Sequence, residues 1–228
     1  DKYPIAFVYQ NYNQSKNSDA TILDTLSIQG KDYLLHVGSF DKRKDLIALV
    51  RAFDLLKKRE SNFTLKLILA GETKVHGNTS VFEDLSTYIR DNNLQDSVLM
   101  PGYLSKAQIK SLYSNASAYV FPSKEEGFGI PVLESFSCGL PVITSNNPAL
   151  LEVGGDATIS FEIGNVETLS KNIEDLFHSK KLSEKLIEKG FKRLSFFSRK
   201  SFVKDFEKLI LSSERQCQTV KIYDARKS

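Results

Sequence analysis

Short apolar runs alternate with segments of helical period along most of the chain, and this alternation restricts the fold more than any other feature. The apolar runs predict strands at residues 33–37, 65–70, 98–100, 118–121, 141–144 and 158–161. Apolar residues recur at helical spacing near residues 44–59, 81–89, 106–115, 130–138, 166–178 and 181–194. Strands that alternate with helices predict βαβ units, which form a parallel sheet with helices on both faces. We therefore expect an α/β fold of the Rossmann-like type.

The same pattern divides the chain into three parts. Residues 1–30 are predicted to hold an N-terminal strand followed by a polar connecting loop over residues 10–26. Residues 31–212 are predicted to form the Rossmann-like domain, with its C-terminal helices packed outside the sheet. Residues 213–228 are expected to be a tail.

The composition of the 228 residues is globular and points away from several classes of protein. Apolar residues make up 41% and charged residues 26%, unlike the low hydrophobicity of disordered chains. No apolar run approaches the roughly 20 residues that span a bilayer. The net charge of +3 is too small to indicate a nucleic-acid partner. Cys138 and Cys217 show no zinc-ligand spacing, so we expect no metal site and a reducing, cytoplasmic setting.

The small net charge hides an uneven distribution. Residues 1–177 hold 17 lysines and arginines against 22 acidic residues, whereas residues 178–228 hold 14 against 6. The basic helices of the second part fit two interpretations. They could make a peripheral contact with anionic lipid at the inner face of a membrane. They could instead expose their basic face to solvent and pack their apolar face against the domain, which is the commoner role of amphipathic helices.

The densest chemical motif is the sequence EEGFGIPVLE at residues 125–134. It follows a predicted strand as a glycine-containing loop and enters a helix with Pro131 in its first turn. Glycines let a ligand approach the backbone, and the free amides at a helix start attract anions. Glu126 and Glu134 are expected to face one crevice, where carboxylates suit a hydroxyl-rich ligand because each oxygen accepts hydrogen bonds. The alternative is a capped helix that carries two solvated acids.

A second motif, GSFDKRK at residues 38–44, also follows a strand and opens a helix. Its three successive cations oppose the helix dipole, and this arrangement makes sense if an anion such as phosphate binds there. The alternative is a solubilising patch of surface charge. Both motifs follow parallel strands, so we expect them at the same edge of the sheet, where open α/β sheets bind ligands.

Residues 126–134, followed by CGLPVI at residues 138–143, resemble the E-x7-E signature of the group 1 retaining nucleotide-sugar glycosyltransferases. Those enzymes have the GT-B fold, in which two Rossmann-like domains face a cleft. Residues 36–44 are similar to the family's phosphate-binding turn, and residues 98–103 are similar to its nucleobase region. Residues 148–156 are similar to the loop after the next strand, and residues 197–210 are similar to its terminal helix. The resemblance covers roughly residues 32–212 and implies that they form the donor-binding domain, one half of a GT-B fold.

The resemblance implies catalytic roles for three side chains. Glu126 would hold hydroxyls of the donor sugar, and Lys44, helped by Arg43, would neutralise the diphosphate as it leaves. Cations and a helix N-terminus stabilise the charge that develops when the sugar–phosphate bond breaks, so no metal is required. Ser39 stands where many relatives have an arginine, which places more of the phosphate charge on Lys44 and Arg43.

The resemblance also implies a set of binding residues. Glu134 would bind the ribose hydroxyls, and backbone groups would contact the sugar, the diphosphate and the base. These backbone contacts would come from Gly38, Ser39, Tyr103, Leu104, Gly127, Phe128, Gly129 and Ile130. The histidines are expected to take no part, with His36 in the core and His76 and His178 at the surface.

The function that the resemblance implies is transfer of a hexose from a nucleotide-diphospho-sugar to a glycan or lipid-linked acceptor, with retention of configuration. The donor would be GDP-mannose, which residues 142–153 favour, or a UDP-sugar, and no other cofactor is expected. The family's first domain binds the acceptor, so we expect these residues alone to bind the donor weakly and to transfer poorly. The alternatives are a non-catalytic nucleotide-sugar-binding or scaffold domain, and a GT-B epimerase or phosphorylase.

Overall fold

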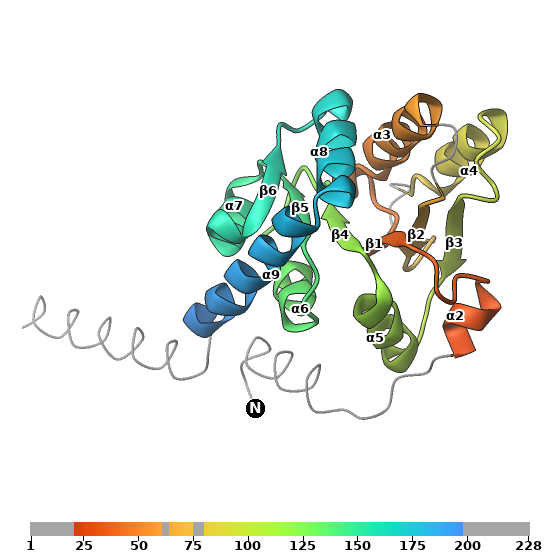
Figure 1. Cartoon of the computed structure of the whole chain (residues 1–228). Coiled ribbons are helices and arrows are strands. Elements are labelled where there is room, and N and C mark those ends of the chain that lie inside the picture. Colours follow the sequence, from red (N-terminus) through yellow and green to blue (C-terminus); the bar gives the residue numbers. More distant parts are fainter. Residues whose placement is uncertain (1–20, 61–63, 75–79, 198–228) are drawn as a thin grey trace, which may run out of the picture.

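The computed structural model describes residues 21–60, 64–74 and 80–197, which form a parallel sheet of six strands between layers of helices (Figure 1). The strands are β1 (Tyr33–Val37), β2 (Lys66–Ala70), β3 (Val98–Gly102), β4 (Ala118–Phe121), β5 (Val142–Ser145) and β6 (Thr158–Phe161). Their order across the sheet is β3-β2-β1-β4-β5-β6. The chain therefore runs outward from β1 to one edge, returns to the centre at β4 and runs outward to the other edge. This is the Rossmann order, and it confirms the predicted fold class.

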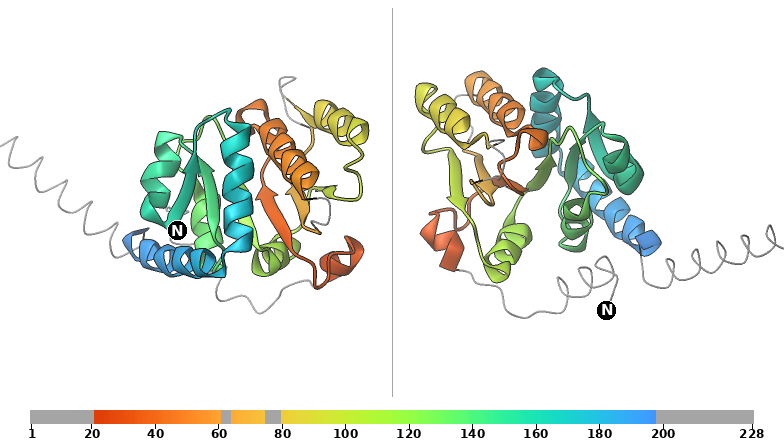
Figure 2. Two further views of the ribbon diagram at one scale, coloured as in Figure 1. Left: turned by 45° about the horizontal axis from the view of Figure 1, so that its top comes forward. Right: turned by 180° about the vertical axis from the view of Figure 1, so that it is seen from behind.

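Two hydrophobic clusters lie on the two faces of the sheet, because successive residues of a strand point to opposite sides. Leu34 and Leu67 belong to the first cluster, and their neighbours Leu35 and Ile68 belong to the second. The first cluster is covered by α3 (Leu46–Arg59), α4 (Phe82–Asp91) and α8 (Val166–His178). The second is covered by α2 (Thr21–Thr25), α5 (Lys106–Asn115), α6 (Ile130–Ser137) and α7 (Pro148–Gly154). Figure 2 shows α3 and α8 side by side over the first face.

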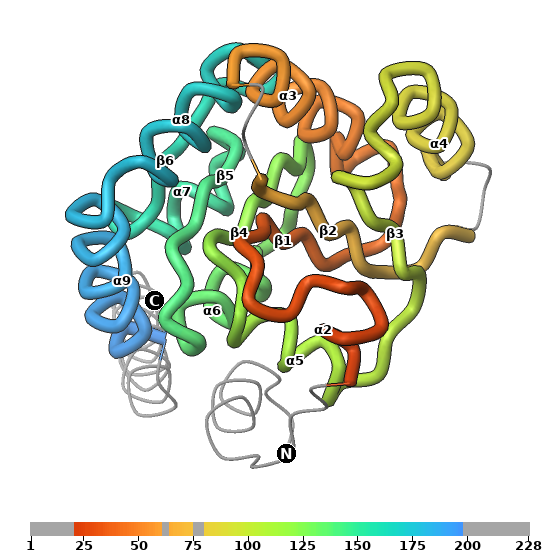
Figure 3. Tube along the Cα trace, turned by 45° about the vertical axis from the view of Figure 1, so that its right-hand side comes forward, coloured from red at the N-terminus to blue at the C-terminus, as the bar shows by residue number. Residues whose placement is uncertain are grey.

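The last described helix, α9 (Lys180–Leu194), packs outside the sheet beside α6 and α8 (Figure 3). Leu186 near its middle belongs to the first cluster and Leu194 at its end belongs to the second. One helix thus contributes to both layers, and the prediction of C-terminal helices outside the sheet is confirmed. The strand predicted near the N-terminus, the helix predicted at residues 199–212 and the tail at 213–228 lie outside the described residues.

The polar loop predicted over residues 10–26 is wrong at its end, because residues Thr21–Thr25 form the helix α2. Ile22 and Leu23 are buried in the second cluster, and α2 packs against α5. A helix of five residues is too short to show a helical period, and such short helices depend on tertiary packing. The division of the chain into three parts stays a prediction.

The helix predicted from Lys44 begins two residues later, at Leu46. Residues Lys42–Lys44 form the separate 3-10 turn η1, and Asp45 breaks the helical path with a left-handed φ of 48°. The predicted cap of α5 is confirmed, since the side chains of Ser105 and Gln108 bond reciprocally to each other's backbone N–H. Within the described residues, none of the helices has the length and apolar character to cross a membrane.

Candidate functional site

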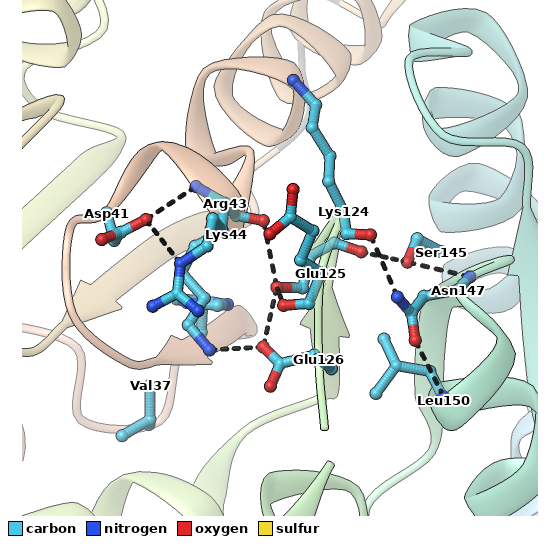
Figure 4. Close-up of polar contacts among 12 residues, drawn as sticks. Val37, Asp41, Arg43, Lys44, Lys124, Glu125, Glu126, Ser145, Asn147 and Leu150 are labelled. Carbon is cyan, nitrogen blue, oxygen red and sulfur yellow. Dashed lines mark hydrogen bonds and ion pairs between the residues drawn. The ribbon is translucent and has the colours of Figure 1, made fainter. Parts of the chain in front are cut away.

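Two loops meet at the carboxyl ends of β1 and β4, where the strand order of the sheet reverses. β1 and β4 pair in parallel, with Leu35 opposite Tyr119. The loop after β1 (residues 38–45) and the loop after β4 (residues 122–129) therefore leave the sheet at the same edge. Figure 4 shows Lys44 and Glu126, one from each loop, pointing toward one another. The structure thus brings the two sequence motifs together, as their positions after parallel strands predict.

The loop after β1 forms a tight cationic turn. Asp41 caps η1 by accepting a hydrogen bond from the backbone N–H of Arg43 at 2.9 Å. The same carboxylate oxygen lies 3.1 Å from Nε of Arg43. The Arg43 side chain is 57% exposed, so this ion pair contributes about 1 kcal/mol or less. Arg43 is therefore directed at its own loop, while Lys44 turns to the other one.

Lys44 and Glu126 form the centre of the site. Nζ of Lys44 donates a hydrogen bond to Oε1 of Glu126, and the two side chains are only 17% and 14% exposed. The ammonium also lies 5.2 Å from the centre of the Phe121 ring, within range of a cation–π contact. The hydroxyl of Ser123 donates to the same Glu126 oxygen at 2.7 Å. Water screens charges buried to this extent only weakly, so the pair interacts more strongly than a surface pair.

Further contacts lock the two loops together beside this pair. The backbone N–H of Lys124 donates to the Arg43 carbonyl at 2.7 Å. The Lys124 ammonium lies 3.0 Å from the carboxylate of Asp45. Asp45 holds the left-handed conformation noted above, which aspartate tolerates better than most residues. Neither residue was identified by sequence reasoning, because a contact between loops leaves no periodic signal in the sequence.

Polar side chains from β5 and the start of α7 hold the loop after β4 from its other side (Figure 4). Oγ of Ser145 donates to the Ser123 carbonyl. Nδ2 of Asn147 donates to the Lys124 carbonyl at 3.0 Å, and the side-chain oxygen of Asn147 caps α7. An asparagine followed by proline is a recognisable helix start. That signal predicts the cap of α7, but it does not predict the contact with a loop 23 positions away.

Glu134 lies inside α6 and has a different environment from Glu126. Its Oε2 accepts a hydrogen bond from the Tyr113 hydroxyl at 3.2 Å. Burial raises the pKa of the Glu134 carboxyl, and the hydrogen bond from Tyr113 opposes this shift. Within the described residues, the two carboxylates share no hydrogen-bond partner. Glu126 thus faces a cation, whereas Glu134 faces a neutral hydroxyl.

The helix α6 begins directly after the loop that follows β4. Gly129 occupies the N-cap position with a φ of 100° and, among the described residues, no side chain caps the first turn. The N–H of Ile130 is thus at a helix start of the kind that attracts anions. Gly127 is exposed, and a Cβ at this position would meet no atom within 4 Å. Phe128 packs edge-on against Phe197, with ring centres 5.9 Å apart.

The other predicted binding residues lie at the same edge of the sheet. Gly38 opens the loop after β1 and donates its N–H to the Ala70 carbonyl at 2.9 Å, with Ser39 half-buried beside it. Tyr103 follows β3 and is 84% exposed, while Leu104 packs on the second cluster. β2 lies between β1 and β3, so Tyr103 and Leu104 are set to one side of the Lys44–Glu126 pair.

His36 is a core residue, as predicted, and lies beneath the cationic turn. Its ring is fully buried, with Nδ1 3.0 Å from the Val120 carbonyl. Burial lowers the pKa of His36 to about 4, and the nearby Lys44 charge adds to this effect. The ring is therefore neutral near pH 7, and the contact with Val120 assigns its proton to Nδ1. In the described part of the chain, no three His, Cys, Asp or Glu side chains group as metal ligands would.

Comparison with known proteins places the chain in a family. A model of the family described as "Glycosyl transferases group 1" matches residues 19–193. The chain belongs to the group 1 glycosyl transferases. One curated relative of this glycosyl transferase is O-antigen chain mannosyltransferase B of Escherichia coli, which is 32% identical over 154 residues. The match covers 67% of this chain and 38% of that protein, so the chain spans less than half of the relative's length.

Solved structures of other proteins share the fold. Alr3699/HepE of Anabaena, determined in complex with UDP and glucose, has a TM-score of 0.74 and 18% identity, covering 90% of this chain and 54% of that one. The C-terminal domain of a group 1 family protein (LpcC) from Francisella tularensis has a TM-score of 0.68 and 19% identity, covering 82% and 95%. Identities at this level establish the fold alone. The family resemblance is thus confirmed, while the E-x7-E roles of Glu126 and Glu134 stay predictions.

Proposed function

We propose that this glycosyl transferase chain binds the donor of a retaining hexosyltransferase whose acceptor is a glycan or a lipid-linked glycan. The observation that carries the proposal is the Lys44–Glu126 pair beside the start of α6, at the reversal of strand order. Ligands of open α/β sheets bind at this reversal. A cation, a carboxylate and free helix amides suit the two parts of one ligand, a diphosphate and a hydroxyl-rich sugar.

The charged groups of the site are suited to stabilising a diphosphate as it leaves the sugar. Transfer breaks the bond between the sugar carbon and the diphosphate oxygen, and the electron pair of that bond stays on the diphosphate. Lys44, Arg43 and the N–H at Ile130 stabilise this developing charge, so we propose that no metal is required. Ser39 adds no positive charge of its own, so Lys44, the more buried of the two cations, carries the larger share.

The remaining predicted residues take the other parts of the donor. Glu126 accepts hydrogen bonds from sugar hydroxyls, and Glu134 accepts them from the ribose. Backbone groups near the sugar come from Gly127, Phe128 and Gly129, those near the phosphates from Gly38 and Ser39, and those near the base from Tyr103 and Leu104. The exposure of Tyr103 and Gly127 supports these contacts, since both face solvent in the free protein.

Two of the related proteins suggest different donors. The mannosyltransferase relative supports GDP-mannose, whereas the HepE complex with UDP and glucose supports a UDP-hexose. The curated relative is much longer than this chain, and we propose that the acceptor is held by a second Rossmann-like domain of the GT-B type. These residues alone would then bind the donor weakly and transfer poorly.

The charges of α9 bear on whether the protein also meets a cytoplasmic membrane surface. Lys189 pairs with Asp156 at 2.7 Å, and Lys192 pairs with Glu188 at 2.5 Å. Arg193 donates to the Val153 carbonyl at 3.0 Å. These three contacts engage part of the basic face of α9 within the chain, and we propose that α9 exposes a solvated face and does not bind lipid. Co-sedimentation with anionic liposomes at low salt tests this choice, and binding that disappears at high salt would contradict it.

Titration calorimetry tests the donor site directly. The chain is titrated with UDP, GDP and ADP, and then with UDP-glucose and GDP-mannose. We expect the wild type to bind the nucleotides of one base best. We expect Lys44→Ala to bind the same nucleotide at least about tenfold more weakly, because a charged hydrogen-bond partner of the phosphate is lost. Glu134→Ala is expected to weaken binding of the same nucleotide. Lys180→Ala, which removes a lysine 90% exposed on α9, is the matched control. Equal affinity in all these proteins would overturn the site assignment.

A further inference from the structure

Ser123 makes a contact with Glu126 that the proposed function does not use. The Ser123 side chain is fully buried in the loop after β4. Its hydroxyl oxygen lies 2.7 Å from Oε1 of Glu126, 3.1 Å from the Arg43 carbonyl and 3.4 Å from the Glu125 carbonyl. A hydroxyl has one proton to donate. The shortest contact is also the one to a charged acceptor, so the proton belongs on the bond to Glu126.

The backbone on both sides of this hydroxyl is held by other elements. Ser145 donates to the carbonyl of Ser123 itself, and Asn147 donates to the carbonyl of the next residue, Lys124, at 3.0 Å. On the opposite side, the N–H of Lys124 donates to Arg43 at 2.7 Å. The position of the Ser123 hydroxyl is therefore set by β4, β5 and the cationic turn together. A donor held in this way can orient a flexible glutamate side chain.

Glu126 uses one of its two carboxylate oxygens for both of its bonds. Lys44 and Ser123 both donate to Oε1, and within the described residues Oε2 accepts no hydrogen bond. In the proposed function Lys44 stabilises the diphosphate, so we expect its ammonium to turn from Glu126 to the diphosphate when the donor binds. Ser123 is then the hydrogen-bond donor that still holds Oε1, and it leaves Oε2 directed away for a sugar hydroxyl.

We infer that Ser123 is a positioning residue for the donor sugar, acting through Glu126 by fixing the orientation of its carboxylate after Lys44 has turned to the diphosphate. The inference rests on the proposed function. It separates two parts of donor affinity: Ser123 governs the contribution of the sugar, whereas the contribution of the nucleoside diphosphate comes from Lys44 and the start of α6.

The test measures the sugar's contribution as the ratio of two dissociation constants, one for the nucleoside diphosphate and one for the corresponding nucleotide sugar. Calorimetry gives this ratio for the wild type, Ser123→Ala, Glu126→Ala and the double variant. Ser135→Ala is the matched control, since Ser135 is equally buried but donates to the Pro131 carbonyl of its own helix. Ser123→Cys keeps a γ atom at this buried position but replaces the hydroxyl by a larger thiol that is a weaker donor, and it replaces Ser123→Ala if that variant does not fold.

We expect Ser123→Ala to weaken nucleotide-sugar binding about tenfold, with binding of the nucleoside diphosphate changed less than about twofold. We expect no further change when Ser123→Ala is added to Glu126→Ala, because a residue that acts through another has no effect once the other is gone. Additive effects, or equal losses for both ligands, would overturn the inference and leave the donor site intact. Absence of any nucleotide binding by the wild type would overturn the proposed function, and the inference with it.

Discussion

Lys44 and Glu126 lie 82 positions apart in the chain, and the Lys44 ammonium donates a hydrogen bond to the Glu126 carboxylate. In the proposed function the two groups serve different parts of one ligand, with Lys44 on the diphosphate and Glu126 on the sugar. In the free protein each group instead neutralises the other. Donor binding must therefore separate a largely buried ion pair, and the diphosphate competes with Glu126 for Lys44.

This competition predicts that Glu126→Gln strengthens binding of the nucleoside diphosphate without its sugar. The substitution removes the charge that holds Lys44 and keeps the shape of the side chain, so we expect a roughly threefold to tenfold gain in affinity at low salt. Calorimetry at low salt measures it. Glu125→Gln removes the same charge from the neighbouring exposed position and is the control. An equal gain in both variants would indicate a general field effect, and no gain in Glu126→Gln would show that Lys44 is not released.

The left-handed conformation of Asp45 predicts an unusual order of stabilities. Asp45→Ala should lower the free energy of unfolding by about 1–2 kcal/mol, because alanine tolerates φ of 48° poorly. Asp45→Gly should be more stable than Asp45→Ala, because glycine adopts this conformation freely. Lys124→Ala isolates the ion pair and should cost about 1 kcal/mol or less, since Lys124 is 46% exposed. Urea unfolding measures all three, and equal stability of the alanine and glycine variants would contradict the explanation.

The buried His36 predicts a loss of stability in mild acid. Its pKa is lowered from 6.5 to about 4 in the folded protein, so between these values the unfolded chain binds a proton that the native state excludes. His36 therefore leaves the free energy of unfolding unreduced above about pH 6.5. Below that pH the free energy of unfolding falls, by roughly 3 kcal/mol in total as the pH drops toward 4.

Urea unfolding at pH 7 and pH 4.5 checks this dependence. The carboxylates also titrate in this range, but they do so in every variant, so their contribution cancels when the variants are compared. His36→Gln removes the titratable ring, so it should lose less stability between the two pH values than the wild type does. His178→Gln is the control, because that histidine is 53% exposed and pairs with Glu60 at the surface. A wild type and a His36→Gln variant with the same pH dependence would show that His36 is not the responsible group.

Gly127 predicts a variant that folds normally but loses the ligand. A Cβ at Gly127 would meet no atom within 4 Å, so Gly127→Ala should change the free energy of unfolding by less than about 0.5 kcal/mol. In the proposed site the added methyl meets the donor sugar, and we expect at least about tenfold weaker nucleotide-sugar binding. Calorimetry and thermal unfolding on one preparation measure both effects, and unchanged binding would remove Gly127 from the site.

Gly71 provides the opposite case within the same protein. A Cβ there would lie 1.8 Å from the carbonyl oxygen of Gly38, at a φ of 148°. Gly71→Ala must therefore move backbone at the start of the cationic turn, and it should destabilise the fold by several kcal/mol. The contrast between Gly71 and Gly127 separates a glycine required by packing from one required by a ligand.

The regular elements were largely predictable because each carries its own local signal. The bounds of α5, β4, β6 and α8 agree with the predicted residues, since these segments combine clear periodicity with a cap or a turn at their ends. α2 was not predictable, because its five residues owe their order to packing against α5. The start of α3 was misplaced by two residues, because the conformation of Asp45 depends on the loop around it.

The sequence by itself determined the α/β class, the placement of two motifs after strands and the family to which they belong, because periodicity and motif spacing are local properties of the chain. It named Lys44 and Glu126 separately. Only the tertiary structure paired them and joined Ser123, Ser145 and Asn147 into the support of one loop. Contacts of this kind join residues many positions apart, and they exist only when the sheet brings the ends of its central strands together.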